Sequence, residues 1–438
     1  MVRRALAIAA ALGGSGAALG AEVTHVATAA TATWPIEIDA SVGFEGTIQQ
    51  ADIAKEQFQT TNGTSTLIKG TEMSYQSSTT VIPIRVAAGI WHDLELHVMV
   101  PLIISYDQSW SYSSLSNNGA NDTVNKPAGI CAEGPSSSCG NGLAPGGAWN
   151  TLVPSLPIDS NRGGFVVGNI AIGAAWTPLS EADDHTLPTW LLGFDYIAPT
   201  ASPMDPTVTS YDSNGSTQSA TGDGLHHFHP YTAMSKRQGV FDPYVTLWLD
   251  FAHAMGNTYD NCNHPIYSGT NDPRVNCGVA PFTTDVTRLQ PEYQGGISFG
   301  TEIVPYEDVA NFQKVAFDLR FISEYHSQAR TYTQLSDLLQ ELTEQQDYAR
   351  LGGEAGIAFH AGKYFKATAG FTLVHDTDHW LTNENLGAPN SPAGTQINVD
   401  THVGQNPNFD FRFDNPGSRF LLQSSIIGTL SVQLTAMF

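Results

Sequence analysis

The chain has 438 residues, a net charge of −23, a pI near 4.7 and only 14% charged residues. This length allows two or three soluble domains or one large barrel. The acid surplus excludes nucleic-acid binding, which needs Lys and Arg to neutralise phosphates. Beyond the N-terminus no apolar run reaches the ~18 residues of a spanning helix, a test that barrel strands do not have to meet.

The N-terminus has the features of a secretory signal peptide, expected over residues 1–21. Arg3 and Arg4 precede an apolar core at 5–12, and small residues follow. Cleavage after Gly20 leaves small residues at the required positions, and sites as late as Ala30 are also compatible; a membrane anchor is the alternative. Residues 22–35 are then a periplasmic N-terminal segment and 36–438 the barrel. Export to an oxidising compartment permits disulfides.

Twelve segments alternate apolar and polar residues with the period of a β-strand. In the first, Val42 and Phe44 alternate with Ser41, Gly43 and Glu45. The twelve expected strands are 36–46, 80–90, 93–104, 163–176, 189–199, 225–236, 242–254, 289–303, 314–330, 348–360, 363–376 and 419–438. The threonine-rich stretch up to about Ser78 is expected as loop, and 334–346 as a helix with its leucines at helical spacing.

The connections fall into two classes of length. Those after odd-numbered strands are long, and those after even-numbered strands are short. Because an antiparallel barrel places alternate connections at opposite ends, all the long loops share one rim. This pattern predicts an all-β fold, a single antiparallel transmembrane barrel of about 12 strands with short periplasmic turns and long extracellular loops. A soluble all-β protein is the alternative.

The last strand ends the chain on Phe438, with apolar residues at alternate positions before it. This ending resembles the C-terminal assembly signal of bacterial outer-membrane barrels. The resemblance implies the cell outer membrane as location. It also implies lipid, lipopolysaccharide and the barrel-assembly machinery as partners.

The four cysteines lie in two expected outer loops, Cys131 with Cys139 and Cys262 with Cys277. Three connectivities are possible, and pairing within each loop is favoured because the others require two loops to meet. The spacings are too wide for a zinc knuckle.

Two groups of side chains have types that bind transition metals. The first is His226, His227 and His229 beside Asp223, and the second is His375, Asp376, Asp378 and His379. Polar residues at the membrane interface explain both groups, so no metal is expected. His326 and Ser327 point to opposite faces of a strand and cannot form a catalytic dyad, so neither an enzyme nor a cofactor is expected.

Charged side chains on the inward faces are mostly acidic. They are tolerated in a barrel only where they face water or one another. The expected pore-lining residues are Glu37, Asp39, Arg85, Glu95, Asp195, Asp250, Asp318, Arg320, Glu324, Glu354 and Lys366. Either they line an aqueous passage that prefers cations, or they interlock and plug the lumen.

The segment 86–102, with Gly89-Ile90-Trp91-His92-Asp93-Leu94-Glu95-Leu96 and then Pro101, resembles hairpins of transporter-type outer-membrane barrels, including the group linked to phenol-degradation pathways. The resemblance implies passive passage of small, including aromatic, solutes. The chain departs from these barrels in having no recognisable N-terminal plug. The expected function is therefore an outer-membrane channel for small solutes. A closed structural or surface-recognition barrel is the first alternative, and a rim enzyme or metal-binding barrel the second.

Overall fold

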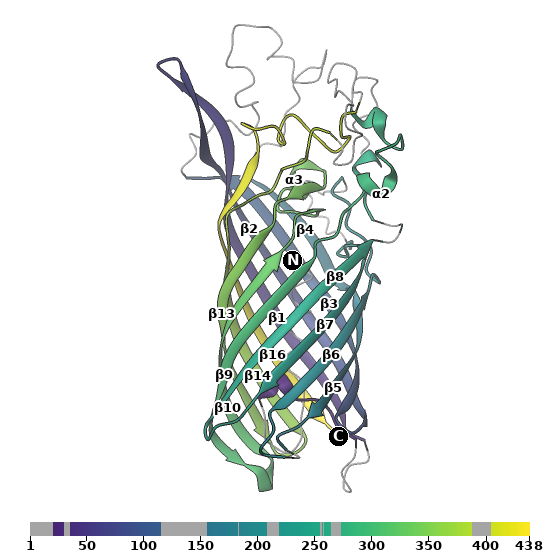
Figure 1. The fold of residues 1–438 in the computed structure, drawn as a ribbon, viewed down its shortest axis with the longest axis vertical. Helices are drawn as coiled ribbons and strands as arrows, with labels where there is room; N and C mark the ends of the chain where they lie inside the picture. The colour runs from purple at the N-terminus through teal and green to yellow at the C-terminus, as the bar shows by residue number, and fades with distance from the viewer. Residues whose placement is uncertain are drawn as a thin grey trace.

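The computed structural model describes residues 21–29, 36–114, 156–182, 184–207, 219–254, 256, 258–263, 273–387 and 404–438. They form one tall, tilted-strand barrel with several connections gathered at its upper end (Figure 1). Twelve strands form the barrel wall, counting β4 and β5 as one, and each pairs with the next in sequence order. The last strand pairs with the first, so the antiparallel barrel is closed. The predicted fold class is confirmed.

The wall strands correspond one to one with the twelve expected from the sequence. They are β1 (Ile38–Thr61), β2 (Thr64–Trp91), β3 (Leu94–Tyr112), β4 (Ile158–Val167) continued by β5 (Ile170–Leu179), β6 (Thr189–Ala198), β7 (Leu225–Ser235), β8 (Phe241–Ala254), β9 (Gln294–Asp308), β10 (Gln313–His326), β13 (Tyr348–Ala361), β14 (Phe365–Asp376) and β16 (Phe420–Met437). The short β15 (His379–Trp380) adds to β16 at its outer end. The strand expected at 163–176 is interrupted at Gly168 and Asn169, and β4 and β5 pair separately with β3.

The wall presents apolar side chains outward and polar ones inward. On β1, Phe44 is 45% exposed while its neighbour Glu45 is 4% exposed. The same alternation exposes Leu247 and Leu249 on β8, and Phe317 and Leu319 on β10. No helix in the described ranges has the length and apolarity needed to cross a bilayer. The outer surface is therefore the apolar one, as the period-2 pattern predicted.

The first and last strands close the wall along a seam from Asp39–Met437 to Lys55–Phe420. Ile38 and Phe438 exchange backbone hydrogen bonds of 3.0 and 2.9 Å at its lower end. Phe438 is 60% exposed on the outside. The short turns and both ends of the wall lie at this end, which is the periplasmic end of an outer-membrane barrel.

The threonine-rich stretch expected as loop is instead strand. β1 and β2 continue as a paired ribbon to Thr61–Thr64, with Asn62 and Gly63 at the tip in left-handed conformation, φ 52° and 78°. Figure 1 shows this purple ribbon projecting beyond the rest of the wall. The prediction was wrong because alternation disappears where both faces of a strand meet water. The Asn-Gly pair, a strong hairpin signal, was the overlooked cue.

The connection between β10 and β13 folds over the outer mouth of the barrel. It contains β11 (Ala329–Thr331), α3 (Ser336–Leu339) and β12 (Thr343–Gln345). The helix expected at 334–346 is thus only four residues long, because Gln340 at φ 62° ends it. We call residues 329–345 the cap (Figure 1, around α3).

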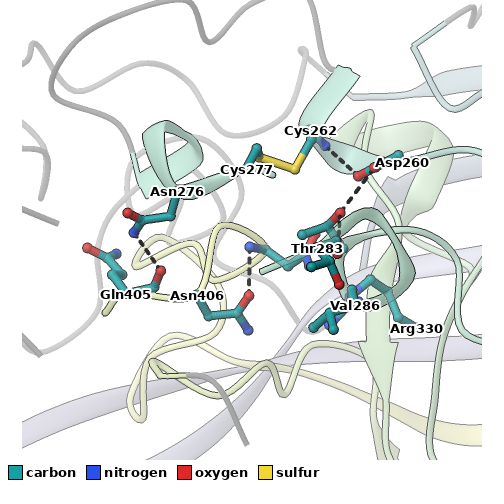
Figure 2. Close-up of a disulfide and its surroundings, with 11 residues drawn as sticks. Asp260, Cys262, Asn276, Cys277, Thr283, Val286, Arg330, Gln405 and Asn406 are labelled. Carbon is teal, nitrogen blue, oxygen red and sulfur yellow. Dashed lines mark hydrogen bonds between the residues drawn. A yellow bond between two sulfur atoms is a disulfide. The ribbon is translucent and has the colours of Figure 1, made fainter. Parts of the chain in front are cut away.

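The connection between β8 and β9 lies beside the cap. It includes η3 (Asn261–Asn263), η4 (Pro273–Asn276) and α2 (Thr284–Thr287), and the Cys262–Cys277 disulfide joins η3 to the end of η4, as favoured from the sequence. Figure 2 shows Asn276 at this disulfide donating from its side-chain amide to the Gln405 carbonyl, at 2.8 Å, which ties the loop to the connection before β16. The Cys131–Cys139 pairing lies outside the described residues.

Candidate functional site

The lower end of the barrel interior is occupied by residues 21–29, which we call the strap. The strap contains η1 (Glu22–Thr24) and lies inside the wall (Figure 1, purple segment near the lower end). The Glu22 carboxylate lies 3.2 Å from Lys314 and 2.5 Å from Lys366, and 2.7 Å from His360 Nε2. The two lysines come from β10 and β14, so a single side chain of the strap ties two wall strands.

Backbone groups of the strap also bind the wall. The N–H of Glu22 donates to Glu302, the N–H of Ala27 donates to Glu95 at 2.7 Å, and the N–H of Thr28 donates to Glu37 at 3.1 Å. Thr28 passes so close to β2 that a Cβ on Gly89 would lie 2.4 Å from its carbonyl carbon. Glycine is therefore required at position 89 for the strap to sit where it does.

The strap changes the interpretation of the N-terminal segment. The sequence assigned 22–35 to the periplasm and contained no recognisable plug, whereas residues 22–29 lie in the lumen. Val23 and Val26 pack there with Ala175, Leu191 and Ala233 of the wall. The reason is that the strap buries apolar side chains, which water outside the barrel would leave exposed.

The outer end of the interior is closed by the cap. Leu335, Leu338 and Leu339 of the cap are buried in an apolar cluster with the wall and the connection before β16. Its other members include Ile53, Met73, Tyr75, Trp110, Leu381, Phe413 and Phe420. The four leucines that suggested a helix are therefore core residues of this closure, with Leu342 in a neighbouring cluster.

One buried ion pair anchors the cap to the wall. Arg162 of β4 lies 2.7 Å from Asp337 of α3, and both side chains are almost fully buried. Ser160 and Tyr332 donate hydroxyl hydrogen bonds to the same carboxylate. Removing either charge would leave the other buried without its main partner, which makes this pair structurally costly to break.

The disulfide loop holds the cap from the side. The Asn261 side chain accepts from the N–H of Leu342 at 2.9 Å and donates to its carbonyl at 3.0 Å. Arg274 lies 2.7 Å from Glu341. Cys262 follows Asn261 directly, and Cys277 is three residues after Arg274. The disulfide therefore stabilises the loop that holds the cap.

Arg330 lies near three acids at the edge of the cap, Glu384, Glu344 and Asp414. It lies against Glu384 and 3.7 Å from Glu344, and Glu384 accepts from Asn406. Burial and the neighbouring Glu384 carboxylate raise the pKa of Glu344 to about 8. Burial and Glu384 also raise the pKa of Asp414 well above its ordinary value. At neutral pH the folded cap therefore favours the protonated form of Glu344.

Between strap and cap, the inward charges pair with one another. Arg85 binds Glu95, Glu95 lies 3.0 Å from His97 Nδ1, and His97 Nε2 lies 2.8 Å from Asp195. A Cβ on Gly173 would lie 2.0 Å from the Asp195 carboxylate and 2.3 Å from His97. Because Gly173 of β5 has no side chain, the hydrogen bond between His97 of β3 and Asp195 of β6 can pass over it on the inner face of the wall.

A second network surrounds Arg320 on β10. Its guanidinium lies 2.6 Å from Asp318 and 3.4 Å from Glu354, and Tyr244 donates to Asp318 at 2.5 Å. Glu22 of the strap and this network line the same small cavity. The strap and the network thus share one space.

All eleven residues expected to line a pore lie on the inner side of the wall or at its lower rim, where they are buried or half-buried. Glu37 binds the strap, Lys366 binds Glu22, Asp250 lies 3.0 Å from His227, and Glu324 lies 3.4 Å from His326. These four side chains therefore each bind a neighbouring side chain or the strap.

The two histidine groups are each divided. His227 has one ring nitrogen on Asp223 and the other on Asp250, both at 3.0 Å, while His226 contacts Tyr196. In the second group, Asp376 binds Arg350, His375 binds the Ser425 carbonyl, and His379 stacks on Tyr348. Asp378 is exposed and accepts from Gln423. Across the described residues, no three His, Cys, Asp or Glu side chains are grouped to hold a metal ion.

Several residues of this interior were not singled out from the sequence: Glu22, Arg162, Lys314 and Asp337. One signal was available. Glu22 is the first acid in the chain and the only one before Glu37, in a segment that is otherwise uncharged beyond Arg4. An isolated acid in such a segment suggests an ion pair with a distant basic residue. The sequence does not show which basic residue is the partner.

No family model matches the sequence, and no curated protein matches it. Among solved structures, an outer-membrane channel from Pseudomonas putida F1 aligns over 91% of this chain and 95% of its own, with 10% identity and a TM-score of 0.38. A FadL homologue from Pseudomonas aeruginosa aligns over 92% and 90%, with 10% identity and a TM-score of 0.33. The outer-membrane protease OmpT from Escherichia coli aligns over 92% and 96%, with 6% identity and a TM-score of 0.28. Similarity at this level carries no function to this chain.

The wall itself decides where the protein sits. A closed barrel satisfies every strand hydrogen bond internally, and this one presents an apolar surface outward and charges inward. The chain is an outer-membrane β-barrel.

Proposed function

We propose that the protein is a passive outer-membrane channel for small solutes, closed in the present state at both ends. The supporting observation is what fills its interior. The strap and the cap are not wall strands; they are separate segments held in the interior by polar contacts and by apolar clusters.

The number of strands explains why such segments matter. An interior of about 8 strands is just filled by its own side chains, and a wider one holds a space. Twelve strands enclose more than their own side chains fill, and here the strap and the cap occupy that space. Withdrawing both would join the periplasmic and outer openings through a polar bore.

The proposed open channel prefers cations. On the described wall strands, inward acids outnumber inward bases: Asp39, Glu45, Glu56, Glu72, Glu95, Asp195, Asp242, Asp250, Glu302, Asp318, Glu324, Glu354 and Asp376 against Lys55, Arg85, Arg162, Lys314, Arg320, Arg350 and Lys366. Acid-lined pores select cations. Aromatic rings inside the wall, including Trp248 beside His229 at 5.4 Å, offer flat surfaces to small aromatic solutes.

Conductance in planar bilayers tests the proposal with three variants. The first lacks residues 22–29. The second replaces residues 332–342 by a two-residue Asn-Gly turn, which fits because Thr331 and Thr343 are paired across the β11–β12 ribbon. The third combines both changes.

Because the two closures lie in series, we expect small conductance from the wild type and from each single variant, and stepwise conductance from the third. Heat-dependent mobility on gels confirms that each variant is a folded barrel. A folded double variant that inserts without conducting would overturn the proposal. It would favour surface recognition instead, for which the projecting β1–β2 ribbon supplies an exposed surface.

A further inference from the structure

The first residue of the strap lies against wall groups that suit a positive charge. The backbone nitrogen of Ala21 is 3.4 Å from the Ser235 hydroxyl, and Ala21 is fully buried. The next nitrogen, that of Glu22, donates to the Glu302 carboxylate. Ser235 on β7 and Glu302 on β9 lie on either side of β8, so this end of the strap crosses three strands.

Between Ser235 and Glu302 lies a buried carboxylate without a partner. Asp242 of β8 pairs in register with Glu302, and two residues along β8 is Tyr244, which pairs with Ser235. Asp242 is 1% exposed, and neither of its oxygens has a hydrogen-bond partner in the described part of the chain. A carboxylate buried in this way is strongly destabilising unless a donor reaches it.

The charges around the strap are also unequal. The carboxylates are Glu22, Asp242 and Glu302, and the lysines among them are Lys314 and Lys366. The nearby bases are already engaged: Arg237 lies 2.5 Å from Glu307, and Lys236 lies 3.4 Å from Glu181. Lys314, Lys366 and His360 all contact Glu22, and Lys314 also contacts Glu302, so none of these bases is hydrogen-bonded to Asp242.

We propose that the missing charge is the α-ammonium group of Ala21, created when the signal peptide is cut after Gly20, and that it binds Asp242 and Glu302. Hydrolysis of the Gly20–Ala21 bond consumes one water. It gives Gly20 a carboxylate and turns the single N–H of Ala21 into a cationic group with three N–H donors. Ser235 and the two acids provide three acceptors. Maturation therefore completes the inner closure, whether or not the opened barrel conducts solutes.

The test uses protein purified from the outer membrane. Mass spectrometry identifies the first residue, expected to be Ala21. An acetylating N-hydroxysuccinimide ester is then applied at neutral pH, where a free α-amine reacts readily. We expect acetylation of Ala21 at least about tenfold slower in the folded barrel than after unfolding in hot detergent, because a buried, ion-paired amine reacts only when it opens.

Two variants locate the partner. Asp242→Asn should speed acetylation in the folded barrel about tenfold, whereas Asp285→Asn, a change at an exposed acid in the outer loop, should not. Inserting one Ala after Gly20 moves the amine by about 3.5 Å and should also expose it.

A first residue other than Ala21, or equal acetylation rates in folded and unfolded wild type, would overturn the proposal. These measurements do not use conductance. Their failure would therefore leave the channel proposal standing, and a silent barrel would leave this one standing.

Discussion

The two ends of the interior are closed by different kinds of interaction. The cap buries leucines among aromatic and aliphatic side chains, and buried ion pairs and the disulfide loop hold it in place. The strap has a smaller apolar cluster around Val23 and Val26, and its other contacts join Glu22 and backbone N–H groups to charged wall residues. Apolar burial is non-directional and tolerates shifts, whereas charged hydrogen bonds require defined geometry. Different perturbations should therefore open each end.

The largest effect should come from the buried Arg162–Asp337 ion pair, which joins the cap to the wall. Arg162→Met leaves Asp337 buried without its cation, which costs roughly 3–5 kcal/mol. Hydrogen exchange of amides in α3, such as that of Leu339 bonded to the Leu335 carbonyl, should then accelerate strongly. The strap amides should keep their wild-type rates.

Arg162→Met combined with Asp337→Leu provides the control, since it removes both charges together. This double variant should recover part of the lost protection. Equal acceleration at cap and strap would mean that the two closures are a single cooperative unit.

A smaller effect is expected at the strap. Glu22→Gln removes the charge that ties Lys314 and Lys366 and should release the strap, with a loss of about 1.5–3 kcal/mol for charged hydrogen bonds. A cysteine placed at Val23, buried in the wild type, should react with a maleimide faster in this background. Unchanged labelling would show that the backbone N–H contacts alone hold the strap.

The cap should become less stable as pH rises. The folded-state pKa of Glu344 is about 8, above its ordinary value, so the folded cap binds a proton that the opened cap loses. This stabilisation is complete at acidic pH and disappears as pH rises through about 8. Exchange in 336–345 should accelerate between about pH 4.5 and pH 8 and then level off, after correction for the intrinsic rate.

Glu344→Gln should flatten that pH dependence, because an amide stays neutral. Arg330, Glu384 and Asp414 remain in the variant, so a profile that keeps its slope would assign the titration to Asp414.

The smallest effect is expected on the ion selectivity of the bore that lies between the strap and the cap. In the barrel lacking both strap and cap, Asp318→Asn with Glu324→Gln should reduce the preference for cations, measured as the reversal potential in a salt gradient. The parent double deletion is the matched control. An unchanged reversal potential would mean that these acids stay paired with Arg320 and His326 in the open state.

The wall could be predicted from the sequence and the filling of the bore could not. Alternation of Val42 and Phe44 with Glu45 is a local property, so each strand revealed its own orientation. The contact of Glu22 with Lys314 joins residues 292 positions apart, and nothing near either residue specifies the other. The cap is intermediate: its leucines showed a buried face, but the left-handed Gln340 that shortens the helix left no pattern.

The seam between β1 and β16 has a consequence for biogenesis. The strap is attached to the start of β1, so it travels with the first wall strand, yet the wall becomes a closed ring only when the final strand joins that same edge. Once the ring is closed, the segment destined for the lumen can enter only through the lower end, where β1 begins and where the strap binds. Docking of the strap from the periplasmic side is therefore a separate step from closure of the wall, and it can follow that closure.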